Sequence, residues 1–256
     1  MTLRFAFNSP VVLVFALICC VATALDTLCS WPSVQQGLTS LGIATHDRLC
    51  FTVPFFAAWP WAHFRSRSAL SWLRLVTHVF GHNSIEHLSG NMQLLLVVGP
   101  TCEEKYGSRV LMRLLVITAV ASAATHMVFS ADATVLMGAS GVVFMLVAVN
   151  SFVNFRVGRV PLTSVLTALL FVGKELSAMR TNPKGGISFL AHLTGGVAGA
   201  VLGYLVNLGL ARKASRGTSA RNGDSGIASA PGPGPVLVPQ RMQAQPMQIQ
   251  AHMHAA

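Results

Sequence analysis

The sequence predicts an all-α membrane protein, and three observations support that fold class. Of the 256 residues, 52% are hydrophobic and only 10% are charged, whereas ordinary soluble domains carry roughly 25% charged residues. The mean hydropathy is +0.58. The apolar residues also gather into six separate segments along the chain. These observations exclude a disordered, collagenous or disulfide-framework protein.

The apolar segments differ in length, and the difference indicates where a site lies. They cover residues 10–28, 88–99, 110–129, 138–153, 160–173 and 187–210. A helix rises 1.5 Å per residue, so about 20 residues are needed to cross the hydrocarbon core. The first, third and sixth segments reach that length, and the other three are short. Short spans with glycine or polar ends often line an internal cavity, so we expect a site inside a helical bundle.

The net charge of +10 is explained by membrane topology. With a cytoplasmic N-terminus, 11 of the 18 lysine and arginine residues lie on the cytoplasmic side, mostly in short connections and the tail. This distribution favours a multi-pass membrane protein over nucleic-acid binding. Arg4, the following apolar stretch and Ala22-Thr23-Ala24 also resemble a cleavable signal peptide, and cleavage would leave five spans.

The first loop, residues 29–86, is the longest connection between apolar segments. Its aromatic part, residues 51–64, contains Trp59 and Trp61 and fits either a membrane-interface segment or a small hydrophobic core. Cys29 and Cys50 share this loop, so the sequence leaves one disulfide open. After a transmembrane domain at residues 1–210, the polar, Gly-, Pro- and Gln-rich residues 211–256 predict a disordered cytoplasmic tail.

Polar residues within apolar spans are costly and therefore indicate function. His87 and Asn91 are four residues apart, so they share a helix face and can both donate hydrogen bonds to an oxyanion. Ser140 begins the fourth segment within Gly138-Ala139-Ser140-Gly141, where small neighbours and free helix N–H groups admit a substrate. His192 precedes Gly195 and Gly199 on a face suited to close helix packing.

Ser140 and His192 together fit a nucleophile and its general base. None of the eight Asp and Glu residues falls in the middle of a span, so a dyad is expected rather than a triad. The same count excludes an intramembrane aspartyl protease. The H-E-x-x-H pattern is absent, and we expect neither a metal nor another cofactor. Taken singly, each residue also has a structural explanation, such as a serine bonded to its own helix.

The pattern His82-x4-His87-x3-Asn91, then Gly138-Ala139-Ser140-Gly141, then His192-x2-Gly195-x3-Gly199 resembles the rhomboid family of intramembrane serine proteases. The resemblance covers about residues 73–205. It implies a six-transmembrane-helix bundle with Ser140 as nucleophile and His192 as general base. It further implies an oxyanion hole made by His87, Asn91 and the backbone N–H of Ser140.

The resemblance also implies supporting roles for four further residues. His82 matches a position that orders the site, and Arg74 and Glu103 match residues that brace the first loop and the second helix. Phe144 stands where many members carry a tyrosine whose ring stacks on the catalytic histidine. Stacking survives that change, whereas the hydroxyl is lost.

We therefore expect a serine endopeptidase of the cell membrane that cleaves transmembrane protein substrates near the non-cytoplasmic face. Its partners would be those substrates and the lipid bilayer, and the sequence carries no indication of its oligomeric state. One alternative is a catalytically silent relative that binds membrane proteins. Another is a solute or metal transporter that uses His82, His87 and His126 as ligands, although no internal repeat supports it.

Overall fold

A computed structural model describes residues 8–40, 50–130, 134–151 and 186–223, together with single positions between 162 and 180. These residues are helical throughout, apart from turns, loops and one isolated bridge between Ala58 and Leu136. The described residues thus confirm an all-α fold. By its contacts the chain divides into Met1–Lys213, which contains the helical bundle, and Ala214–Ala256.

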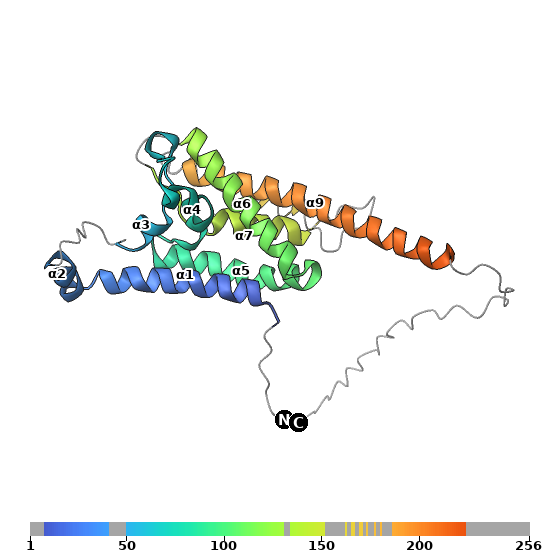
Figure 1. Ribbon diagram of the computed structural model, residues 1–256, viewed down its shortest axis with the longest axis horizontal. Coiled ribbons are helices and arrows are strands. Elements are labelled where there is room, and N and C mark those ends of the chain that lie inside the picture. The colour runs from blue at the N-terminus through green and yellow to red at the C-terminus, as the bar shows by residue number, and fades with distance from the viewer. Residues whose placement is uncertain are drawn as a thin grey trace, which may run out of the picture. The chain divides into compact units, whose positions relative to one another are not determined.

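The long helices coincide with apolar segments, and three shorter helices lie in the first loop (Figure 1). The helices are α1 (Pro10–Cys29), α2 (Pro32–Ser40), α3 (Thr52–Phe56), α4 (Ala69–Thr77), α5 (Ile85–Tyr106), α6 (Ser108–Phe129), α7 (Ser140–Ser151) and α9 (Gly186–Gly223), with short 3-10 turns η1 (Trp61–His63) and η2 (His78–Phe80). The predicted segment 160–173 lies mostly outside the described residues. Helix α9 continues beyond residue 210 to Gly223, and the boundary between bundle and tail stays a prediction.

Three helical stretches within the described ranges are long and apolar enough to cross a membrane: α1, α6 and Leu190–Gly209 of α9. Helix α5 has 22 residues, but charged residues occupy its first and last turns. Helix α7 has 12 residues. The chain is therefore a membrane protein with three candidate spans in its described part, and the count of six stays a prediction.

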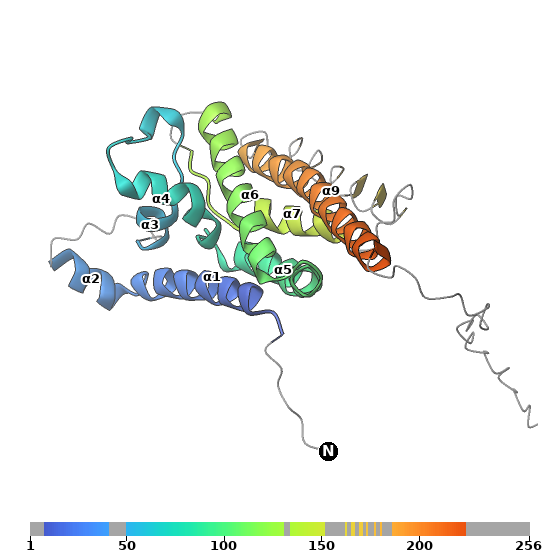
Figure 2. The same cartoon turned by 45° about the vertical axis from the view of Figure 1, so that its right-hand side comes forward.

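Helix α7 is the centre of the bundle. Its residues Gly141–Leu146 are all buried, as expected for a helix that is apolar on every side. Helices α5 and α6 pack against it, and α7 lies among α5, α6 and α9 in both views (Figures 1 and 2). At 1.5 Å per residue it is about 18 Å long, against about 30 Å of hydrocarbon. At least one of its ends therefore lies below the membrane surface.

Helix α1 is held against α5 by close packing and by a buried carboxylate. A Cβ on Gly99 of α5 would lie 2.8 Å from Cγ2 of Val12. The carboxylate of Glu103 accepts hydrogen bonds from the N–H groups of Val11 and Val12, both at 3.1 Å. An acceptor at a helix N-terminus satisfies N–H groups that have no partner within the helix. Glu103 thus holds the start of α1 against the end of α5, and a cleavable signal peptide in this segment stays a prediction.

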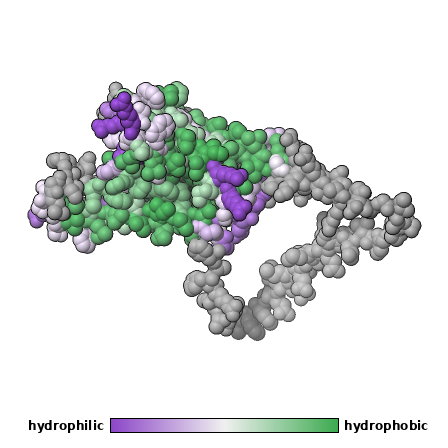
Figure 3. Space-filling view, viewed as in Figure 1, coloured by the Kyte–Doolittle hydropathy of each residue, from purple (hydrophilic) through white to green (hydrophobic). Residues whose placement is uncertain are grey.

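The outer faces of the long helices are apolar, as a lipid-facing surface requires. Leu17 of α1, Phe129 of α6 and Val197 of α9 are 63%, 69% and 55% exposed. Figure 3 shows apolar residues covering most of the visible helical face, while hydrophilic residues gather in a few patches. Apolar side chains both inside and outside the bundle are typical of membrane helices.

The loop between α1 and α5 has a buried part and an exposed part. Ala57 and Ala58 are buried, whereas Trp61 is 71% exposed. Cys29 and Cys50 form a disulfide at the start of this loop. One carboxylate oxygen of Asp26 accepts the N–H groups of Phe51 and Thr52 at 2.7 and 3.0 Å, which fastens the loop to the end of α1.

Candidate active site

Ser140 is the first residue of α7, and glycine is required just before it. Gly138 has a φ of +123°, a conformation that other residues adopt only with strain. A Cβ at Gly138 would also lie 2.7 Å from Cε1 of His87. The turn therefore brings the backbone before Ser140 against the ring of His87.

His82 connects α5 to the same turn. Its Nε2 accepts a hydrogen bond from Nδ2 of Asn91 at 3.1 Å and a longer one from the N–H of Ala139 at 3.5 Å. Nδ1 lies 3.3 Å from the carbonyl oxygen of Phe80, so the consistent tautomer is neutral with the proton on Nδ1. Burial lowers the pKa of His82 to about 4, which maintains that neutral form. His82 thus orients Asn91 and the residue preceding Ser140.

His87 lies on the first turn of α5, where Ser84 caps the helix by accepting the His87 N–H at 3.2 Å. Its ring centroid is 5.1 Å from that of His82. Nδ1 of His87 lies 2.8 Å from Oδ1 of Asn83, and a carbonyl oxygen only accepts, so Nδ1 carries the proton. Donation from Nε2 to an oxyanion then requires either a protonated ring or a reversed Asn83 amide.

His192 reaches the site from α9 because glycines allow that helix to approach α7. A Cβ on Gly195 would lie 2.0 Å from the carbonyl oxygen of Gly141, and one on Gly199 would lie 2.5 Å from that of Met145. Such contact between backbones is possible only without side chains. The residue one turn before Gly195 is His192, which the contact places beside the first turn of α7.

The ring of His192 stacks on Phe144, with centroids 4.6 Å apart and planes inclined by 6°. Phe144 is four residues after Ser140, so the two residues share one face of α7. His192 also lies near enough to His87 for their charges to interact. The structure therefore gathers His87, the start of α7 and His192 in one region, with Asn91 connected to it through His82.

The two bracing residues contact different parts of the bundle. The guanidinium of Arg74 on α4 donates to the carbonyl oxygen of Pro54 in α3, which ties two elements of the first loop together. Glu103 on α5 accepts from the N–H groups of Val11 and Val12 and from Oγ of Ser108 at 2.7 Å. It therefore joins the ends of three helices and lies apart from the loop.

Sequence reasoning gave no role to two buried polar groups that shape this region. Asp26 fastens the first loop, and its only sequence signal is a carboxylate in the last turn of an apolar helix. Ser122 of α6 is buried behind the site, with Oγ 2.8 Å from the position of a Cβ on Gly141. Across the described ranges no three His, Cys, Asp or Glu side chains converge as metal ligands.

A serine hydroxyl, an imidazole and nearby N–H donors are the groups that acyl transfer requires. The hydroxyl attacks a carbonyl carbon, the imidazole takes its proton, and the donors stabilise the oxyanion. Ser140 lies at the N-terminus of α7, where backbone N–H groups without helical partners favour negative charge.

Comparison with known proteins points to one family. A model of the rhomboid domain matches residues 69–208. The chain is 28% identical over 149 residues to "Rhomboid-like protein 11, chloroplastic" from Arabidopsis thaliana, covering 54% of this chain and 53% of that protein. It is 29% identical over 145 residues to "Rhomboid-related protein 2" from Mus musculus, covering 52% and 47%. The matches thus span about half the length of each relative.

Proposed function

The chain belongs to the rhomboid family, and from that premise we propose that it is an intramembrane serine endopeptidase. Ser140 is the nucleophile and His192 is the general base. The observation that carries the proposal is the stack of His192 on Phe144, one turn from Ser140 on the same face of α7. The stack fixes the plane of the imidazole beside the helix face that carries Ser140, which is where a general base for that hydroxyl is needed.

The reaction proceeds in two steps. Oγ of Ser140 attacks the scissile carbonyl while His192 takes the hydroxyl proton, and Asn91 and the Ser140 N–H stabilise the oxyanion. His87 joins them with the Asn83 amide reversed, so that Nε2 of His87 carries the proton. The tetrahedral intermediate collapses as His192 gives the proton to the leaving amine, which leaves an acyl-serine. Water activated by His192 then attacks the ester, and the proton returns to Ser140 as the acid product leaves.

The proposed substrates are transmembrane segments of other proteins in the cell membrane. Ser140 lies at the end of a helix shorter than the hydrocarbon core, so a segment cleaved there comes from within or beside the bilayer. A peptide bond in a helix is hidden by its own hydrogen bonds, so the segment must unwind locally. We expect small or helix-destabilising residues near the cut.

To test this proposal, the purified chain is incubated in liposomes with a panel of transmembrane segments. The cleavage sites are then located by mass spectrometry. Ser140→Ala should abolish cleavage and labelling by a fluorophosphonate, because both need the hydroxyl. Ser151→Ala, at the other end of α7 with Oγ bonded to the carbonyl of Val147, is the matched control and should retain both. Undiminished cleavage by Ser140→Ala would refute the assignment. A folded chain that neither cleaves nor accepts the label would instead be a silent binding relative.

A further inference from the structure

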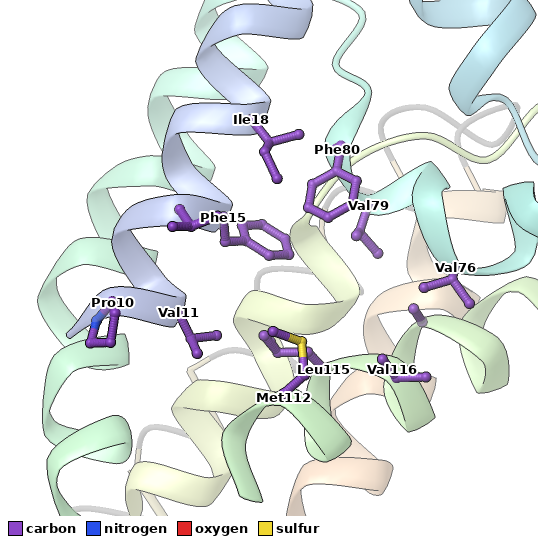
Figure 4. A pocket seen from close by; sticks show the side chains of 12 residues that line it. Pro10, Val11, Phe15, Ile18, Val76, Val79, Phe80, Met112, Leu115 and Val116 are labelled. Atoms are coloured by element: carbon purple, nitrogen blue, oxygen red, sulfur yellow. The ribbon is translucent and has the colours of Figure 1, made fainter. Parts of the chain in front are cut away.

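An open apolar groove lies between α1 and α6, on the surface of the bundle. It has a volume of about 290 Å³, and all 12 lining residues are apolar (Figure 4). Helix α1 contributes Val11, Val14 and Ile18, which follow one helix face, and α6 contributes Met112 and Val116. Because the lining offers no polar group, the groove fits a hydrocarbon ligand.

The groove exists because α1 packs mainly on α5 and leaves its other side open toward α6. Phe15 and Phe80, with ring centroids 4.9 Å apart, form part of its floor. Ala119 of α6 is also buried there, and its small side chain leaves depth. Figure 4 shows Ile18 and Phe80 at one end and Val11 and Met112 at the other.

The length of the groove along α1 is close to the thickness of one leaflet of a bilayer. Its lining on α1 runs from Pro10 to Ile18, which is about 12 Å at 1.5 Å per residue. Half of the hydrocarbon core is about 15 Å thick. The lining on α1 belongs to the half nearest the helix N-terminus. On α6 it runs from Met112 to Ala119 at the middle of the helix, and Val76, Val79 and Phe80 of α4 and η2 line the rest of the groove.

Two exposed cations lie on α6 close in sequence to the residues that line the groove. Arg109 and Arg113 occupy the first turns of α6 and are both exposed. Each lies three residues before a lining residue, Met112 and Val116, and therefore on a neighbouring part of the helix surface. Arginines at such depths extend to the headgroup region, where they attract phosphates.

The acidic residues that precede α6 leave Arg109 and Arg113 available to bind a phosphate. Glu103 is 3% exposed and is occupied by the N–H groups of α1 and by Ser108. Glu104 is exposed and accepts from Nδ2 of Asn8 at 2.7 Å. An anionic headgroup would therefore meet two arginines and one exposed carboxylate.

We propose that the groove binds one acyl chain of an anionic phospholipid whose phosphate lies against Arg109 and Arg113. The apolar lining selects the hydrocarbon chain, the length selects a chain from one leaflet, and the arginines select a negative headgroup. The site lies between α1 and α6 and uses none of the residues proposed for catalysis.

The test is native mass spectrometry of the full chain in detergent with phosphatidylglycerol or phosphatidylcholine of identical acyl chains. The unaltered chain should retain one phosphatidylglycerol in preference to phosphatidylcholine. Val116→Trp fills the groove and should remove both lipids. Val120→Trp is its matched control on the same helix, because Val116 and Val120 are 38% and 40% exposed and only Val116 lines the groove.

The charge is tested by Arg109→Gln combined with Arg113→Gln. Retention of phosphatidylglycerol should fall about fivefold per arginine, hence roughly 25-fold, while phosphatidylcholine is unaffected. Arg65→Gln with Arg67→Gln, in the first loop, removes the same charge away from the groove and should change neither.

Three results would overturn the proposal: equal retention by Val116→Trp and Val120→Trp, no preference for phosphatidylglycerol, or a dimer that Val116→Trp abolishes. The dimer would make the groove a protein interface. If Val116→Trp does not fold, Val14→Trp fills the groove from α1, where Val14 is 50% exposed.

Discussion

Replacing Gly195 with alanine should push α9 away from α7 and misplace His192. The added Cβ would lie 2.0 Å from the carbonyl oxygen of Gly141 and 2.9 Å from its Cα. Both atoms belong to the backbone of a buried helix, so no side chain can turn aside. Restoring ordinary contact near 3.4 Å requires a local displacement of about 1.4 Å between the helices.

The loss of activity follows from that displacement. Misplacing a reacting group by about 1 Å can reduce the rate about 100-fold, and the crowded contact should also cost about 1–3 kcal/mol of stability. Gly196 supplies the matched control, because a Cβ there meets nothing within 4 Å. Gly196→Ala should therefore cleave within about threefold of the unaltered chain, since surface changes alter energies by only a few tenths of a kcal/mol.

The assay measures kcat/KM for a transmembrane substrate in liposomes and the rate of fluorophosphonate labelling, at a temperature where both variants keep their helical circular dichroism. Gly195→Ala should lower both kcat/KM and the labelling rate by about 100-fold. Equal rates for the Gly195 and Gly196 variants would show that the close approach of α7 and α9 does not align Ser140 with His192.

Three further predictions follow from individual contacts. Phe144→Leu removes the ring stacked on His192 and should lower kcat up to about tenfold, whereas Phe144→Tyr keeps the stack and most of the activity; equal losses would contradict this. Glu103→Gln weakens the charged cap on α1 and should lower the free energy of unfolding by about 1–2 kcal/mol in a denaturant titration, whereas Glu104→Gln should change it little. Burial lowers the pKa of both His78 and His82 from 6.5 to about 4, so the unfolded chain binds more protons between these values. Stability should be full above pH 6.5 and fall as the pH decreases toward 4, and thermal midpoints that do not change across this range would be inconsistent with it.

The sequence predicted the bounds of α1 and α6 well because hydropathy alone determines them. The expected segments 10–28 and 110–129 differ little from α1 (Pro10–Cys29) and α6 (Ser108–Phe129). The segment expected at 88–99 is too short, because α5 covers Ile85–Tyr106. Its last turns contain Glu103, whose charge is accommodated by N–H groups of α1 more than 90 residues away in the chain. Local hydropathy cannot identify a hydrogen-bond partner that lies so far away in the sequence.

The sequence predicted which residue types form the site, but it predicted few of the hydrogen bonds between them. The spacing of His87 and Asn91, and of His192, Gly195 and Gly199, indicated which residues share helix faces. It did not indicate that His82 would be the group that binds Asn91 and the turn before Ser140, nor that Asp26 would fasten the first loop. The contact of His82 with Ala139 joins residues 57 positions apart, and that of Asp26 with Phe51 joins residues 25 positions apart.

The bond between Cys29 and Cys50 indicates which side of the membrane the first loop faces. Disulfides persist in oxidising compartments and are reduced in the cytosol, so the end of α1 that bears Cys29 is expected to face a lumen, a periplasm or the cell exterior. Thr27 and Ser30 of that end line one small pocket with His82 and Ser84, so the ring that orients Asn91 lies at the same end of the bundle. Under the proposed function, products released at this end would enter that compartment, and glutathione reaching it would break the covalent link between the first loop and α1.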